Sequence, residues 1–121
     1  MSEQTGTMMI PFGVIAHKET FESTVIDAVD QTLSALGQPI KDAIYRSVEK
    51  QFGLTKQQIP CEMALFTHAI EYIFKDAAAL VEGNIIKNIN REVKGFSYGN
   101  KGEELPLVDY IVALQKHFNN G

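Results

Sequence analysis

The segment Met63–Phe74, with the sequence MALFTHAIEYIF, decides the fold. Its apolar side chains recur as adjacent pairs one helical turn apart: Leu65 with Phe66, Ala69 with Ile70, and Ile73 with Phe74. This spacing predicts an α-helix with an apolar stripe wide enough to touch two neighbours at once. Polar side chains interrupt the stripe only at Thr67, His68 and Glu71. We therefore expect this helix to be the most buried one in the protein.

Four other segments repeat apolar residues at the same helical spacing and are bounded by start or stop residues. They are about Thr20–Leu36, Pro39–Phe52, Asp76–Val93 with Asp76 as N-cap, and Pro106–Phe118. Leu36, Ile40 and Leu80 are expected to belong to the apolar stripes. The pattern predicts an all-α fold, a compact bundle of about five helices that forms a single domain over residues 18–121.

The turns between these helices have their own signals. Gly37 and Pro39 stop the first helix, and Gly53 followed by Leu54 is typical of a left-handed C-terminal cap. Thr55 and Gln58 have the spacing of a capping box, which predicts a single helical turn before Pro60. Residues 96–104 are rich in glycine and predict an exposed loop.

Residues 1–17 precede the predicted bundle, and we expect a flexible N-terminal arm there. Within this arm, Ile10, Phe12 and Val14 alternate and would lie on one face of an extended chain. This apolar face can pack against the bundle of the same chain or against a partner. The sequence leaves both alternatives open.

Composition excludes several classes of protein. The net charge of −4 gives no electrostatic surplus for binding nucleic acid. A small positive strip at Lys87, Arg91 and Lys94 is flanked by acidic residues and is interpreted as solvated surface. No apolar run approaches the roughly 20 residues of a membrane-spanning helix. Cys61 is the only cysteine, which excludes an internal disulfide and is consistent with a cytoplasmic protein.

Residues that could perform chemistry are few. His68 and Glu71 form a single His-x-x-Glu pattern without a second copy, so we expect no metal site. Cys61 follows Pro60 near a predicted helix start and is the one candidate for a reactive thiol, although free cysteines are more often structural. No other catalytic or cofactor-binding motif is present. We therefore expect neither an enzyme nor a bound cofactor.

Residues 39–93 resemble a small archaeal helical domain, the Nitrosopumilus-type output domain. The residues that carry the resemblance are Ala43–Tyr45, Val48–Leu54, Ile59–Pro60, Phe66–Phe74, Ala78–Glu82 and Ile85–Ile86. The resemblance implies an all-helical module used for protein interaction in signalling. The chain departs from the family pattern at Lys75-Asp76, where a glycine is usual after Ile73-Phe74.

The chain is apolar for its length, which favours a homodimer over an isolated bundle. The sequence therefore predicts a non-enzymatic interaction or signalling (output) module that self-associates. The candidate interface residues are apolar or aromatic: Phe12, Val14, Ile26, Tyr45, Tyr72 and Phe96. The alternative is a small-molecule sensor that binds its ligand between helices, with Tyr45, His68 and Tyr72 as polar contacts.

Overall fold

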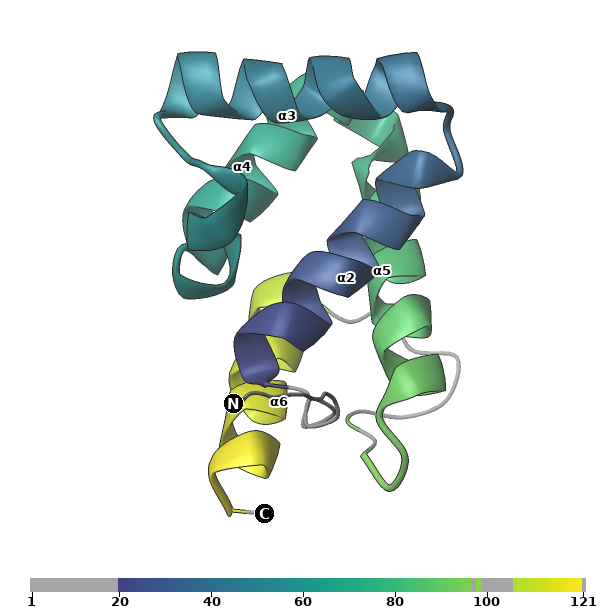
Figure 1. Ribbon diagram of the computed structural model, residues 1–121, viewed down its shortest axis with the longest axis vertical. Coiled ribbons are helices and arrows are strands. Elements are labelled where there is room, and N and C mark those ends of the chain that lie inside the picture. The colour runs from purple at the N-terminus through teal and green to yellow at the C-terminus, as the bar shows by residue number, and fades with distance from the viewer. Residues whose placement is uncertain (1–19, 97, 99–105, 121) are drawn as a thin grey trace, which may run out of the picture.

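Five α-helices and two short 3₁₀-helices account for most of the described chain (Figure 1). The structure is a computed structural model that describes residues 20–96, 98 and 106–120. In chain order the elements are α2 (Phe21–Ser34), α3 (Gln38–Phe52), η2 (Lys56–Cys61), α4 (Met63–Phe74), η3 (Lys75–Ala77), α5 (Ala78–Glu92) and α6 (Leu107–Asn120). The predicted all-α fold is confirmed. The predicted N-terminal arm, including Phe12 and Val14, and most of the predicted 96–104 loop lie outside the described residues.

Local signals in the sequence set most helix boundaries. Thr20 caps α2 through a reciprocal pair of 3.0 Å hydrogen bonds with Ser23. Gly53 ends α3 in the left-handed conformation, with φ 67°. The predicted capping box at Thr55 is confirmed, because the Thr55 N–H donates to Gln58 Oε1 at 2.9 Å. The prediction that this turn ends before Pro60 is wrong, since η2 includes Pro60 and ends at Cys61.

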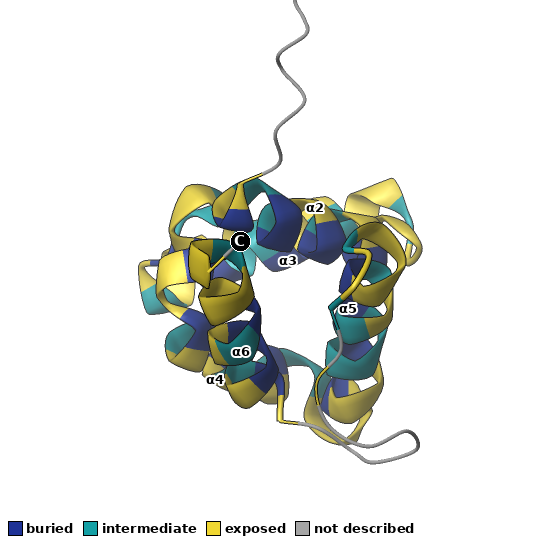
Figure 2. Ribbon diagram, turned by 90° about the horizontal axis from the view of Figure 1, so that it is seen from below, coloured by how far each residue is buried: buried dark blue, intermediate teal, exposed yellow. Residues whose placement is uncertain are grey.

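The centre of the core lies along α2. Val25, Val29 and Leu33 are fully buried, and α2 contacts α5, α3, α6 and η2. Figure 1 shows α2 and α5 side by side, with α3 crossing above them. In Figure 2 the buried faces of the helices point toward the middle of the bundle. The prediction that Met63–Phe74 is the most buried helix is therefore wrong, since a larger share of α2 is buried than of α4.

Side-chain hydrogen bonds add specificity to the α2 and α5 contact. Asn88 Nδ2 donates to Thr32 Oγ1 at 2.8 Å, and the Thr32 hydroxyl donates to the Ala28 carbonyl at 2.8 Å. Gln31 Nε2 donates to Glu92 Oε2 at 3.1 Å further along the same contact. Because Thr32 is buried, these bonds satisfy a polar group that would otherwise destabilise the core.

Two sequence expectations fail at helix ends. Leu36, Ile40 and Leu80 are exposed, since each lies just outside a helix or in its first turn, where no neighbouring helix covers the side chain. Asp76 is not an N-cap, because it lies within η3 and α5 begins at Ala78 with Ala77 as its cap. The irregular turn between α4 and α5 is the reason for this second difference.

Candidate functional site

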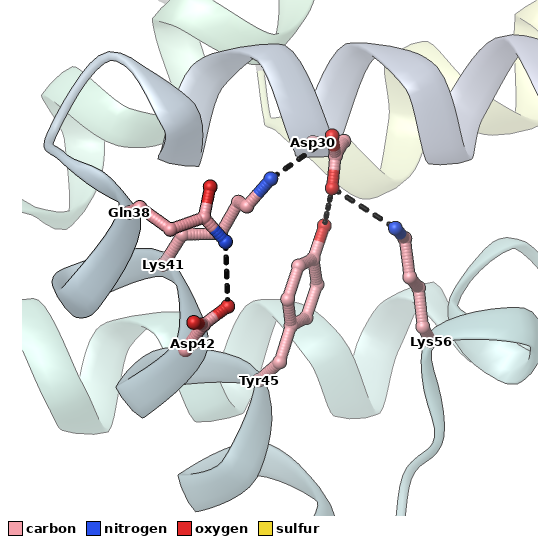
Figure 3. A network of polar contacts seen from close by, with 6 residues as sticks. All are labelled: Asp30, Gln38, Lys41, Asp42, Tyr45 and Lys56. Atoms are coloured by element: carbon pink, nitrogen blue, oxygen red, sulfur yellow. Dashed lines mark hydrogen bonds and ion pairs between the residues drawn. The ribbon is translucent and has the colours of Figure 1, made fainter.

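Asp30 on α2 is the centre of a polar network that joins three elements (Figure 3). Its carboxylate accepts hydrogen bonds from Lys56 Nζ at 2.9 Å, from the Tyr45 hydroxyl at 3.1 Å and from Lys41 Nζ at 3.4 Å. The Lys56 ammonium also lies 5.1 Å from the centre of the Tyr45 ring. The Asp30 network therefore ties α2 to α3 and η2.

The electrostatics of this network follow from its geometry. Desolvation opposes ionisation of Asp30, but the hydrogen bonds from Lys56 and Tyr45 outweigh it and lower the pKa of the carboxyl. Desolvation, reinforced by the Asp30 charge, raises the pKa of Tyr45 well above its usual value. Both groups are thus kept in the protonation state that their hydrogen bond requires: Tyr45 is protonated and donates, and Asp30 is ionised and accepts.

A second cluster lies where α3 meets α4, and it contains aromatic side chains. The Phe52 ring contacts the His68 and Tyr72 rings edge to face, each with a centroid separation of 5.8 Å. The Lys75 ammonium lies 4.7 Å from the centre of the Tyr72 ring. Tyr72 is nevertheless 54% exposed. The Tyr72 ring therefore contacts both Phe52 and Lys75, while about half of its surface is exposed to solvent.

Lys75 adopts an unusual backbone conformation beside this cluster. With φ 55° and ψ −123°, it is the only non-glycine residue with a positive φ in the described part of the chain. Such a conformation costs a residue with a Cβ of order 1–3 kcal/mol. Glycine would adopt this conformation without strain, so the chain keeps a side chain here at a cost in backbone free energy.

Three other energetically unfavourable features lie in the same segment. Desolvation, with a contribution from the neighbouring charge of Glu71, raises the pKa of Glu82. The buried Thr67 hydroxyl has no hydrogen-bond partner among the described residues. Leu80 is 67% exposed. We call residues 67–82, from Thr67 on α4 to Glu82 on α5, the α4–α5 corner.

The predicted site residues are thus distributed over several places. His68 and Tyr72 meet at Phe52, whereas the Tyr45 hydroxyl is bonded to Asp30. Ile26 is half-buried on α2, and Phe96 is half-buried against Tyr110 and His117. Tyr72 is the only one of the four described interface candidates that is exposed.

Neither Cys61 nor the titratable side chains of the described residues form a cluster with the composition of a metal site. Cys61 is exposed at the end of η2. Within residues 20–96, 98 and 106–120, no three His, Cys, Asp or Glu side chains gather in a way that could hold a metal ion. Across the same residues, no helix combines the length and apolarity that spanning a bilayer requires.

Sequence reasoning missed both Asp30 and Lys75. The partners of Asp30 come from residues 11 to 26 positions further along the chain, so no local pattern marks it. Lys75 did have a signal, since it follows an apolar helix end where a glycine is expected. The structure places Lys75 at a positive φ, which a glycine would adopt without strain.

Comparison of the chain with protein-family models, with curated proteins and with solved structures finds no match. The resemblance to the archaeal output domain stays a prediction.

Proposed function

We propose that this protein is a non-enzymatic interaction or signalling (output) module that associates with a second copy of itself through the α4–α5 corner. The observation that supports this proposal is the concentration of unfavourable features in one short segment: a strained Lys75, two repelling carboxylates, an unpaired buried hydroxyl and two exposed apolar side chains. Strain and unsatisfied groups persist mainly where function requires them.

Tyr72 has the properties of an interface anchor. Large aromatic side chains dominate binding energy when a partner buries them. Phe52 and Lys75 already hold the Tyr72 ring, so little conformational entropy would be lost on binding. An exposed but ordered ring of this kind suits a protein partner.

The charges of the corner favour a second copy as that partner. Lys75 and the carboxylates of Glu71 and Glu82 lie in one segment. In a two-fold symmetric dimer, the same surface meets itself, so Lys75 of one copy can face the acidic pair of the other. This arrangement would relieve the repulsion between Glu71 and Glu82 and cover Tyr72 at once.

The first test is the molar mass in solution as a function of concentration, measured by sedimentation velocity. We expect a rise from monomer to dimer, and Tyr72→Asp should abolish it because a buried unpaired carboxylate opposes association. Val112→Asp is the matched control, since Val112 is also exposed but lies on α6. A wild-type protein that is monomeric at every concentration would contradict the proposal.

An exchange of the charges at Lys75 and Glu71 tests whether the proposed dimer is two-fold symmetric. Lys75→Glu alone and Glu71→Lys alone should each weaken self-association, because like charges would then face each other at both symmetric contacts. A mixture of the two variants should recover dimers, since opposite charges meet at both contacts of the heterodimer. If the mixture associates no better than either variant alone, Lys75 does not face Glu71 across a symmetric interface.

The small-molecule sensor has less support. Of its three expected polar contacts, Tyr45 has its hydroxyl bonded to Asp30 and its ring next to Lys56. His68 and Tyr72 are in contact with Phe52. The three side chains therefore do not share one set of contacts, and we do not propose this function.

A further inference from the structure

Six aromatic side chains form a continuous row of ring contacts that includes residues of α6. Each ring contacts the next at centroid separations between 5.1 and 6.5 Å. We call this set the aromatic row; in order of contact, its members are Tyr98, Tyr110, Phe96, His117, Phe118 and Phe21. The row connects three parts of the chain. These are Phe96 and Tyr98, which follow α5, helix α6, and Phe21 at the start of α2.

The aromatic row has a buried base and an open side. Tyr110 is fully buried, and its hydroxyl donates to Asn90 Oδ1. By contrast, Tyr98 is 43% exposed, His117 is exposed, and Phe96 and Phe118 are half-buried. Because no acidic side chain belongs to the row, its open side presents mainly apolar ring surface.

The row ends at Phe21, only a few residues after an apolar stretch of the sequence. Phe21, its last member, is the first residue of α2, and it contacts Phe118 at 6.3 Å. Residues 8–16, MMIPFGVIA, carry no charge, and three residues connect them to Thr20. An extended chain covers about 3.3 Å per residue, so this connection spans roughly 13 Å and the segment itself about 30 Å. The segment can therefore reach every ring of the row.

We infer that residues 8–16 dock on the aromatic row of the same chain. Ile10, Phe12 and Val14 alternate in the sequence and supply one apolar face, which matches the open side of the row. The short connection gives the segment a high effective concentration at its own row, and this favours binding within one chain over binding to a second copy.

The chain contains no tryptophan, so Phe12→Trp gives the full-length protein a single tryptophan, whose emission lies at longer wavelength than that of the four tyrosines. We expect blue-shifted emission that is protected from acrylamide quenching and independent of protein concentration. Adding Tyr98→Asp should shift the emission to the red and increase quenching. Adding Tyr72→Asp, which alters an exposed tyrosine outside the row, should leave the emission unchanged.

Three results would overturn the inference. Emission typical of a solvated indole would show that the segment does not dock. Burial that appears only at high protein concentration would assign the segment to a second copy. A red shift caused by Tyr72→Asp in place of Tyr98→Asp would assign it to the α4–α5 corner.

Hydrogen exchange supplies a second measurement that does not depend on tryptophan. In the full chain, Phe12→Asp should accelerate exchange of the backbone amides in α6, because the aromatic row would lose its cover. Thr5→Asp is the control, since it adds the same charge outside the apolar stretch. Equal exchange in both variants would contradict docking.

Discussion

The Asp30 network and the α4–α5 corner contain the same types of side chain, namely carboxylates, lysine and tyrosine, but these side chains interact favourably only in the network. In the network, one carboxylate meets two lysines and a tyrosine hydroxyl, and every charge has a partner. In the corner, Glu82 lies near another carboxylate, Tyr72 is exposed, and Lys75 is strained. The comparison separates a part of the molecule whose polar groups stabilise the fold from one whose polar and apolar groups do not, and the second is the part that we propose as the dimer interface. Variants in the two regions should therefore change stability in opposite directions.

The largest expected effect is at Asp30. Asp30→Ala removes the acceptor shared by Lys41, Tyr45 and Lys56, and should lower the free energy of unfolding by about 2 kcal/mol. Urea denaturation at pH 7 measures this change. Asp42→Ala is the control, because exposed Asp42 accepts a single exposed hydrogen bond from Gln38 (Figure 3) and should shift stability by no more than about 0.5 kcal/mol. Equal losses in both variants would show that the Asp30 network adds nothing.

The same network predicts how stability depends on pH. The pKa of Asp30 is lower in the folded than in the unfolded protein, so its contribution is present above the unfolded value of about 3.9 and is lost as the pH falls through the folded pKa. Wild-type protein should therefore lose this stability in acid, whereas Asp30→Ala should lose less over the same range. Parallel curves of unfolding free energy against pH would exclude this role for Asp30.

Lys75→Gly should have the next largest effect and the opposite sign. Glycine adopts a positive φ without strain, so the variant should be more stable by about 1 kcal/mol even though it loses the contact with Tyr72. Gly53→Ala is the mirror control: it places a Cβ at φ 67° and should destabilise the protein by a similar amount. Thermal or urea denaturation measures both. A Lys75→Gly variant less stable than wild type would mean that the lysine contact outweighs the strain.

Glu82→Gln should stabilise the protein slightly at neutral pH. The pKa of Glu82 is raised in the folded state, so its ionised form opposes folding at pH values above that pKa, and the cost disappears as the group becomes protonated. The gain should be a few tenths of a kcal/mol at pH 7 and vanish near pH 4. Glu71→Gln should reproduce part of it by removing the neighbouring charge. A gain in stability that persists at pH 4 would show that it does not come from removing the Glu82 charge.

Tyr72 should likewise have only a small effect on the stability of the monomer. Because the side chain is largely exposed, Tyr72→Ala should change the free energy of unfolding by about 0.5 kcal/mol or less in dilute protein, even though the same residue is the proposed anchor of the dimer. Denaturation at a concentration where the protein is monomeric measures this. A loss of several kcal/mol would place Tyr72 among the residues that hold the fold together.

Much of the fold could be predicted from the sequence because its signals are local. The Thr55 and Gln58 capping box, the left-handed Gly53 and the helical apolar spacing each act within a few residues. The centrality of α2 could not be predicted, since burial depends on how many neighbours a helix acquires. The same reason explains why Leu80 belongs to an apolar stripe in sequence but is exposed in the structure.

The candidate site was predicted only in part. The sequence identifies Tyr72 and His68 as aromatic or polar residues on one helix, but their contact with Phe52 depends on the packing of α3 against α4. Asp30 has partners far along the chain, so only the folded arrangement brings them together. The strain at Lys75 arises because the chain must reverse between two helices without a glycine.

The exposure of Cys61 has a practical consequence for every measurement of self-association. An accessible thiol on each copy can be oxidised to an intermolecular disulfide in air, and such covalent pairs would imitate a reversible dimer. Sedimentation under a reducing agent, or with a Cys61→Ser variant, separates the two. The same lone thiol offers one defined position for attaching a spin label or dye to each molecule.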